Sequence, residues 1–118
     1  MAKILSLSSS EILRTTRQLV LQNEGHNVVT AADLSAIKSL NGDGKPDVAL
    51  IGHDFSGAEK RKIALTLNKH WPGLPILEMC FHSPEIPGAD FILTDAPDQL
   101  IAALREVVGG HRVRGFVH

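Results

Sequence analysis

The hydrophobic and polar positions of this chain form short apolar runs that alternate with longer amphipathic runs. Short runs bounded by turn residues are typical of buried strands, and apolar residues spaced three and four apart are typical of helices. The expected strands are residues 3–7, 26–30, 48–51, 75–79 and 91–93. The expected helices cover residues 12–23, 34–40, 63–71 and 100–108. Strands and helices in this alternation predict an α/β fold with a parallel sheet between helical layers.

Turn and capping residues punctuate this pattern. Ser9 or Ser10 is expected to cap the first helix, and Gly25 is expected to end it. A turn cluster occupies residues 41–46 (Asn-Gly-Asp-Gly-Lys-Pro). Since no internal boundary is visible, we predict one domain over residues 1–109 and a flexible C-terminal tail over residues 110–118.

Composition narrows the possible partners. The 118 residues carry a formal net charge of −1, so no bulk positive field favours nucleic acid or an anionic membrane. The single cysteine, Cys80, excludes an internal disulfide framework and fits a reducing compartment. No apolar run has the length of a bilayer span, and Ser8–Ser10 interrupt the N-terminal apolar run before a signal peptide could form. We therefore expect a cytoplasmic protein.

Several segments, taken in order, resemble one known family. They are residues 24–28 (Glu-Gly-His-Asn-Val), 45–51 (Lys-Pro-Asp-Val-Ala-Leu-Ile), 71–76 (Trp-Pro-Gly-Leu-Pro-Ile) and 88–91 (Gly-Ala-Asp-Phe). Together they make residues 2–108 similar to the receiver domain of bacterial response regulators. The resemblance implies a three-layer α/β/α sandwich, flavodoxin-like and CheY-like, with a five-stranded parallel sheet of order 2-1-3-4-5.

The residues that carry phosphorylation in that family are absent. The resemblance places the two magnesium-binding acids at Ser8 and Ser9 and the phosphoacceptor aspartate at Gly52. It places the switch hydroxyl at Cys80 and the conserved lysine at Asp95. Phosphoryl transfer needs a nucleophile, a bound metal and a neutralising cation. We therefore predict a degenerate receiver, a pseudo-receiver, that is not an enzyme and has no cofactor.

The connection after the fourth expected strand is also unusual. Only residues 83–87 separate His82 from Gly88, and two prolines among them oppose a helix. The sequence therefore predicts that the family's fourth helix is truncated or absent, which would leave the fifth strand as an exposed sheet edge. We expect a contact surface there for a protein partner or a second copy in a homodimer. Its predicted residues are Glu85, Ile86, Phe91, Ile92, Leu93 and Leu104.

Polar side chains follow the third, fourth and fifth expected strands, where neighbouring strand ends could bring them together. His53, Asp54 and His82 define a possible ligand crevice, next to Cys80 and Asp95. Imidazole, thiolate and carboxylate are zinc ligands, but no close-spaced Cys/His motif is present, so a polar rim without metal is favoured. Two further features are interpreted as structural. We expect residues 60–62 (Lys-Arg-Lys) to form the solvated face of a helix and Cys80 to be a small core residue.

These observations favour a phosphorylation-independent receiver-like domain that serves as a protein-protein interaction module in bacterial signal transduction. The alternative is a sensor of a small ligand or a metal that uses the crevice at the carboxyl ends of the strands. A third possibility is a functional phosphoacceptor that uses Asp54, although Asp54 lies two residues beyond the family's position.

Overall fold

A parallel six-stranded sheet forms the centre of the molecule. The structure is a computed structural model that describes residues 2–40 and 44–115. The strands lie in the order β2-β1-β3-β4-β5-β6, and every neighbouring pair is parallel. They are β1 (Lys3–Leu7), β2 (Asn27–Ala31), β3 (Val48–Ile51), β4 (Ile76–Met79), β5 (Asp90–Ile92) and β6 (Arg114–Gly115). The predicted order of the first five strands is confirmed.

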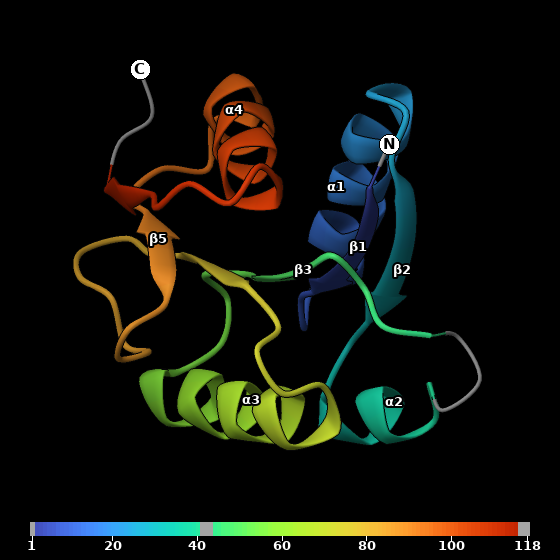
Figure 1. The fold of residues 1–118 in the computed structure, drawn as a ribbon, viewed down its shortest axis with the longest axis vertical. Helices are drawn as coiled ribbons and strands as arrows, with labels where there is room; N and C mark the ends of the chain where they lie inside the picture. Colours follow the sequence, from blue (N-terminus) through green and yellow to red (C-terminus); the bar gives the residue numbers. More distant parts are fainter. Residues whose placement is uncertain (1, 41–43, 116–118) are drawn as a thin grey trace.

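Helices cover both faces of the sheet (Figure 1), as the flavodoxin-like prediction requires. They are α1 (Glu11–Asn23), α2 (Leu34–Lys38), α3 (Gly57–His70) and α4 (Pro97–Val108). Helices α1 and α4 lie on one face, and α2 and α3 lie on the other. None of the helices in the described ranges is long and apolar enough to cross a membrane.

Alternation along the strands supplies two cores. Ile4, Leu50 and Met79 pack in the core that contains α1 and α4 residues such as Leu21 and Leu104. Their sequence neighbours Leu5 and Ile51, and Leu7 two residues after Leu5, point to the opposite face and pack in the core under α2 and α3. Because side chains alternate across a strand, near-continuous apolar strands are what a sheet buried on both faces needs.

Helices α1 and α2 begin within one residue of their predicted starts, whereas α3 begins at Gly57, six residues before its predicted start. The Ser10 side chain accepts a hydrogen bond from the Leu13 backbone N–H, so Ser10 is the N-cap of α1. Helix α3 begins with a reciprocal capping box between Ser56 and Glu59. The predicted turn cluster 41–46 lies partly outside the described residues.

The C-terminal segment differs from the prediction of a flexible tail that begins at residue 110. Arg114–Gly115 form β6, which pairs with β5. The Asp90 carboxylate holds this segment, because Oδ1 accepts the Val113 N–H at 2.7 Å and lies 3.0 Å from Arg112 Nε. The prediction missed this strand because two residues carry no periodicity. Strand β5 is therefore an interior strand, and the prediction that it forms the edge was wrong.

The described residues between β4 and β5 contain no helix, which confirms the prediction of a missing fourth helix. A buried charge organises this connection instead. The Glu78 carboxylate, fully buried on β4, accepts the backbone N–H groups of Glu85 and Ile86 at 2.9–3.1 Å. Lys60 Nζ lies 2.8 Å from Glu78 Oε2 and 2.8 Å from the Met79 carbonyl oxygen. Lys60 is only 4% exposed, so the reading of Lys60 as part of a solvated face was wrong.

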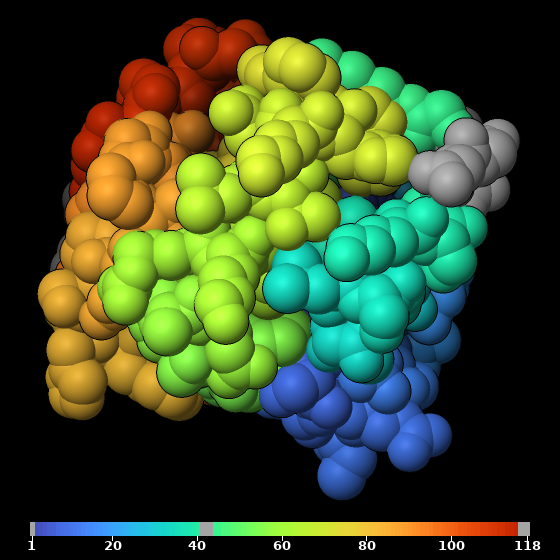
Figure 2. Space-filling model, turned by 90° about the horizontal axis from the view of Figure 1, so that it is seen from below, coloured from blue at the N-terminus to red at the C-terminus, as the bar shows by residue number. Residues whose placement is uncertain are grey.

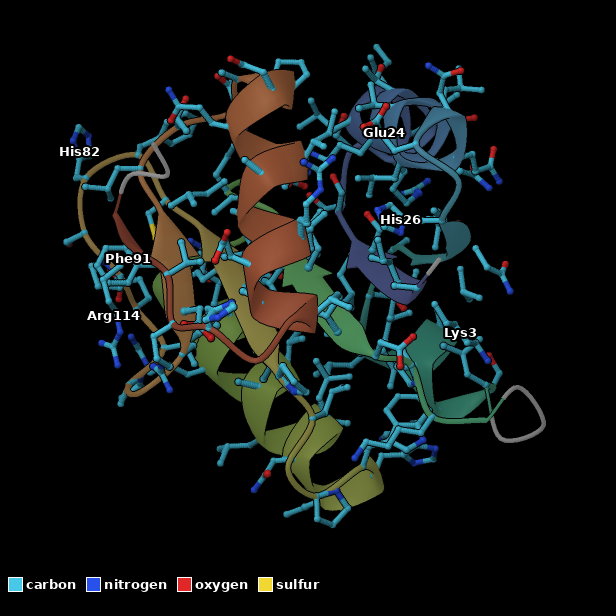
Figure 3. The ribbon with its side chains drawn as sticks, turned by 45° about the horizontal axis from the view of Figure 1, so that its top comes forward. Lys3, Glu24, His26, His82, Phe91 and Arg114 are labelled. Atoms are coloured by element: carbon cyan, nitrogen blue, oxygen red, sulfur yellow. The ribbon has the colours of Figure 1, made fainter. Side chains whose placement is uncertain are left out.

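Three of the six residues predicted to form the contact surface are buried inside the molecule. Ile86, Ile92 and Leu104 are all buried, and Ile92 and Leu104 are completely inaccessible. They cannot contact a partner because they pack in the two cores. Glu85, Phe91 and Leu93 are partly accessible. Figure 3 shows Phe91 beside Arg114, its neighbour on β6.

Candidate functional site

The loops after β1 and β3 meet at the carboxyl end of the sheet and are joined by one carboxylate. Asp54 Oδ2 accepts hydrogen bonds from Ser8 Oγ at 3.0 Å and Ser9 Oγ at 2.6 Å. It also accepts the backbone N–H groups of Ser9 and Ser10. The N-terminal turn that leads into α1 thus wraps around Asp54. Ser8 and Ser9, the two positions that the resemblance assigns to metal-binding acids, are therefore donors to a carboxylate of the same chain.

A buried arginine lies next to this carboxylate. Arg17, on the inward face of α1, is 5% exposed, and its Nη1 lies 3.7 Å from Asp54 Oδ1. Neither terminal nitrogen of Arg17 has a hydrogen-bond partner among the described residues. The pair is therefore ionic without being directly hydrogen-bonded. Arg14 braces the same loop from one turn earlier, because its Nη1 donates to the carbonyl oxygens of Ser8 and Ser9.

Gly52 follows β3 directly, at the position where the resemblance places the phosphoacceptor. Neighbouring atoms leave no space for a side chain there. A Cβ at this position would lie 2.5 Å from Arg17 Nη1, 2.5 Å from Asp54 Oδ1 and 3.1 Å from the Leu7 carbonyl oxygen. The Arg17 guanidinium and the Asp54 carboxylate thus occupy the space that a side chain at residue 52 would need. The chain has a side-chain ion pair where the family has a phosphoacceptor.

The pKa values follow from burial and from these contacts. Burial acts to raise the pKa of Asp54, but hydrogen bonds from Ser9 and Ser8 outweigh it, and the pKa lies below its ordinary value. Burial lowers the pKa of Arg17, against the attraction of Asp54 and Asp95, from a value so high that the group stays charged. The site therefore holds a fixed positive charge beside a carboxylate that remains ionised at neutral pH.

Magnesium, which the fold family implies, does not fit these residues. Mg²⁺ takes an octahedral set of oxygen ligands, usually with carboxylates among them. Ser8 and Ser9 supply neutral hydroxyls that already donate to Asp54, and the Arg17 cation lies beside that carboxylate. A divalent cation at this position would have to displace a guanidinium.

Within the described residues, the other predicted crevice residues, His53 and His82, form no hydrogen bond or ion pair with Asp54. The His53 ring packs on Phe81 with their centroids 4.2 Å apart, and both ring nitrogens are buried without partners among the described residues. Burial, and then the charge of Arg17, lowers the pKa of His53. His82 lies at the outer edge of the molecule and points away from it (Figure 3), so its predicted place in the crevice was wrong. In the described part of the chain, no three His, Cys, Asp or Glu residues are grouped as metal ligands.

The remaining two degenerate positions differ in burial. Cys80 is 2% exposed, and burial, followed by the nearby Glu78, raises the pKa of its thiol to about 12. Such a thiol is a poor nucleophile, so the prediction of a small core residue is consistent with its surroundings. Asp95 is exposed in the loop before α4, near enough to Arg17 to influence its pKa.

Sequence reasoning missed Arg17, the residue that changes the chemistry of the site most. The available signal was its place on α1, four residues after Leu13 and four before Leu21, on the apolar stripe of the helix. A charge on such a stripe must be paired or left unsatisfied. The stripe marks Arg17 as a charge that needs a partner, but the partner itself, Asp54, is identified only by the structure.

Solved structures of receiver proteins superimpose on this chain. A chemotaxis protein of Vibrio cholerae, CheY4, superimposes with a TM-score of 0.77 at 22% identity, over 91% of this chain and 98% of CheY4. A CheY-like receiver domain from Methanospirillum hungatei gives a TM-score of 0.77 at 16% identity, over 93% and 95% of the two chains. TrrA of Thermotoga maritima, solved with Mg²⁺ and BeF, gives 0.70 at 19%, over 93% and 98%.

These likenesses confirm the predicted resemblance: the chain has the CheY-like receiver fold of two-component response regulators. No protein-family model matches the sequence, and no curated protein matches it.

The depressed pKa of Asp54 predicts an acid-sensitive fold. Stability from its hydrogen bonds is complete above the ordinary carboxyl pKa of 3.8 and is lost as pH falls through the lower folded-state pKa. We expect the free energy of unfolding of the wild type, measured by urea titration from neutral pH to about pH 2, to fall more steeply than that of Asp54→Asn. Asp98→Asn, at an exposed helix position, should keep the wild-type slope. Parallel curves for wild type and Asp54→Asn would contradict this assignment.

Proposed function

We propose that this protein is a phosphorylation-independent receiver-like domain that acts as a protein-protein interaction module in bacterial signal transduction. The observation that carries the proposal is the Arg17–Asp54 pair, which takes up the space of a side chain at residue 52. A phosphoryl group on a receiver would need a nucleophile at that point and a metal beside it. Here the same volume holds a cation and an anion that neutralise one another.

The pair also supplies a structural reason for independence from phosphorylation. Asp54 links the loop after β3 to the loop after β1 through Ser8, Ser9 and Ser10. Phosphorylation switches usually work by adding charge that orders or displaces loops of this kind. A permanent internal carboxylate would keep the two loops joined without any phosphoryl donor. We therefore propose one constitutive conformation that is recognised by a partner.

The proposed partner is a protein, either a second copy or another component of the signalling system. Of the predicted contact surface, Glu85, Phe91 and Leu93 are accessible and stay within the proposal, whereas its buried residues do not. Ile86→Glu is unsuitable as a surface variant because Ile86 is 7% exposed and the charge would enter a core. Phe91→Glu is the more suitable change, because Phe91 is partly exposed beside β6.

Exposure to a small phosphodonor tests this function. We expect no gain of a phosphoryl group in the intact mass after incubation with acetyl phosphate and Mg²⁺, because residue 52 has no side chain and Ser8 and Ser9 are poor metal ligands. TrrA, which binds Mg²⁺ and BeF, serves as the positive control under the same conditions. Stoichiometric phosphorylation of this chain, at Asp54 or elsewhere, would instead support the functional-phosphoacceptor reading.

A ligand or metal sensor is the second candidate, and one observation favours it. Arg17 and His53 both carry buried nitrogens without hydrogen-bond partners among the described residues. Buried polar atoms are usually satisfied, either by protein groups or by bound molecules. Isothermal calorimetry with divalent metals and nucleotides distinguishes the candidates: heat that saturates at one equivalent, and disappears in Arg17→Met, would favour the sensor.

A further inference from the structure

An apolar groove lies on the α3 face, beside the amino-terminal ends of β4, β5 and β6. It encloses about 780 Å³ between α3, the segment before β4 and the segments that lead into β5 and β6. In Figure 2 the yellow-green atoms of α3 lie next to the orange and red atoms of those last two segments. The apolar part of the lining includes Leu74 and Ile76, which form the floor. The connection of residues 80–89, which contains no helix, supplies residues 86–89 to the lining.

The groove is held open by interactions that do not depend on a ligand. One wall contains Ile86 and Gly88, and both ends of this wall are fixed. Glu78 accepts the Ile86 N–H at 3.0 Å, and Arg112 Nη2 donates to the Gly88 carbonyl oxygen at 2.7 Å. The opposite wall is α3, whose Lys60 neutralises Glu78. A cavity with fixed walls is preorganised, which lowers the entropic cost of binding.

The accessible polar groups of the groove are mainly hydrogen-bond donors. Arg61 and Arg112 are about half exposed on its rim, and Asn68 and His111 also line it. The one carboxylate in the lining, Asp90, is 9% exposed and already accepts from Val113 N and Arg112 Nε. Two further carboxylates lie outside the lining: Glu85 pairs with Arg61, and Glu106 with His111. The Arg61–Glu85 pair is exposed, so an incoming anion could replace it at small cost.

We propose that this groove binds a small organic anion with an apolar body, of the medium-chain carboxylate class. The volume lies in the range of about 300–1,000 Å³ that is typical of small-molecule sites. The apolar body would lie on the Leu74–Ile76 floor, and the carboxylate would accept hydrogen bonds from Arg61 or Arg112 at the rim. This site is separate from the strand-end ion pair, so the inference stands or falls independently of the proposed function.

Amide chemical shifts during titration with dodecanoate, kept below the concentration at which it forms micelles, test the inference. We expect saturable shifts at residues 61–68, 73–76 and 86–90, and weaker binding of dodecyltrimethylammonium, which has the same tail and the opposite charge. Arg61→Gln should weaken dodecanoate binding by about tenfold, the value of one charge-assisted hydrogen bond. Arg105→Gln is the matched control, because Arg105 also belongs to an exposed ion pair but lies away from the groove.

Substitutions that fill the groove test the inference independently of the charge of the probe. Ala64→Trp should abolish the saturable shifts, whereas Lys62→Trp, on the same helix but outside the lining, should leave them unchanged. Asn68→Trp blocks the same groove from an exposed position and serves if Ala64→Trp unfolds. Equal binding of the cationic and anionic probes, or binding unchanged in the blocked variants, would overturn the inference. Amide shifts of the groove residues that change with protein concentration in the absence of a probe would also overturn it, because they would indicate that a second copy of the chain binds there.

Discussion

Replacing Lys60 by methionine should lower the free energy of unfolding by about 3–5 kcal/mol, the usual effect of removing one partner of a buried ion pair. Methionine keeps most of the side-chain volume but removes the charge that faces Glu78 at 2.8 Å. The Glu78 carboxylate, with no exposed surface, would then be buried without its cation. The Met79 carbonyl oxygen would lose its donor as well. Urea unfolding at neutral pH measures the change.

Arg61→Met is the matched control, because Arg61 follows directly in the sequence and also pairs with a carboxylate, Glu85, at 2.9 Å. That pair is half exposed, so its loss should change stability by no more than about 1 kcal/mol. Adding Glu78→Leu to Lys60→Met should restore only part of the loss, since the N–H groups of Glu85 and Ile86 would lose their acceptor. Similar effects of Lys60→Met and Arg61→Met would contradict the role assigned to the buried pair.

Gly52→Ala should lower stability by about 1–3 kcal/mol, as overpacking a filled site does. The added Cβ would meet the Arg17 guanidinium and the Asp54 carboxylate at 2.5 Å, so both side chains would have to move. Gly52→Asp should cost more, because it adds a second carboxylate beside Asp54. Thermal unfolding followed by circular dichroism measures both changes.

A double-mutant cycle tests whether Arg17 causes the loss of stability in Gly52→Ala. In an Arg17→Ala background, Gly52→Ala should cost less than in the wild type, because the smaller side chain leaves room for the added Cβ. Gly52→Asp should also remain unphosphorylated in acetyl phosphate, since Ser8 and Ser9 cannot replace carboxylates around a metal. An additive cycle, or phosphorylation of Gly52→Asp, would show that Arg17 does not fill the site in solution.

The order and layers of the fold were predictable because they follow from patterns that repeat. Apolar runs such as Val48–Ile51 mark strands buried on both faces, and Ser10 and Gly25 mark where α1 begins and where the chain turns after it. The missing helix was equally predictable from Pro84 and Pro87 within a short connection. Strand β6 was not, because its two residues carry no periodicity and pair with Phe91 and Ile92, and the segment before them is held by Asp90, far away in the sequence.

Tertiary contacts decided the parts that sequence could not supply. Lys60 looked solvated because it stands next to Arg61 and Lys62, yet it is directed to Glu78 on a neighbouring strand. Asp54 was interpreted as a residue of a ligand crevice, yet it caps the turn formed by Ser8–Ser10. The sequence showed that the phosphorylation residues of the family are absent. Only the packing of α1 on the sheet shows that Arg17 and Asp54 fill the space beside Gly52.

The central claim is that the strand-end site is closed by the chain's own Arg17 and Asp54. Titration with beryllofluoride and Mg²⁺, followed by amide chemical shifts, tests it most directly, with TrrA as the positive control. We expect the amides of residues 8–10 and 52–54 to stay at their starting positions at all concentrations. Saturable shifts of those amides, present with beryllofluoride and Mg²⁺ together but with neither alone, would contradict the claim.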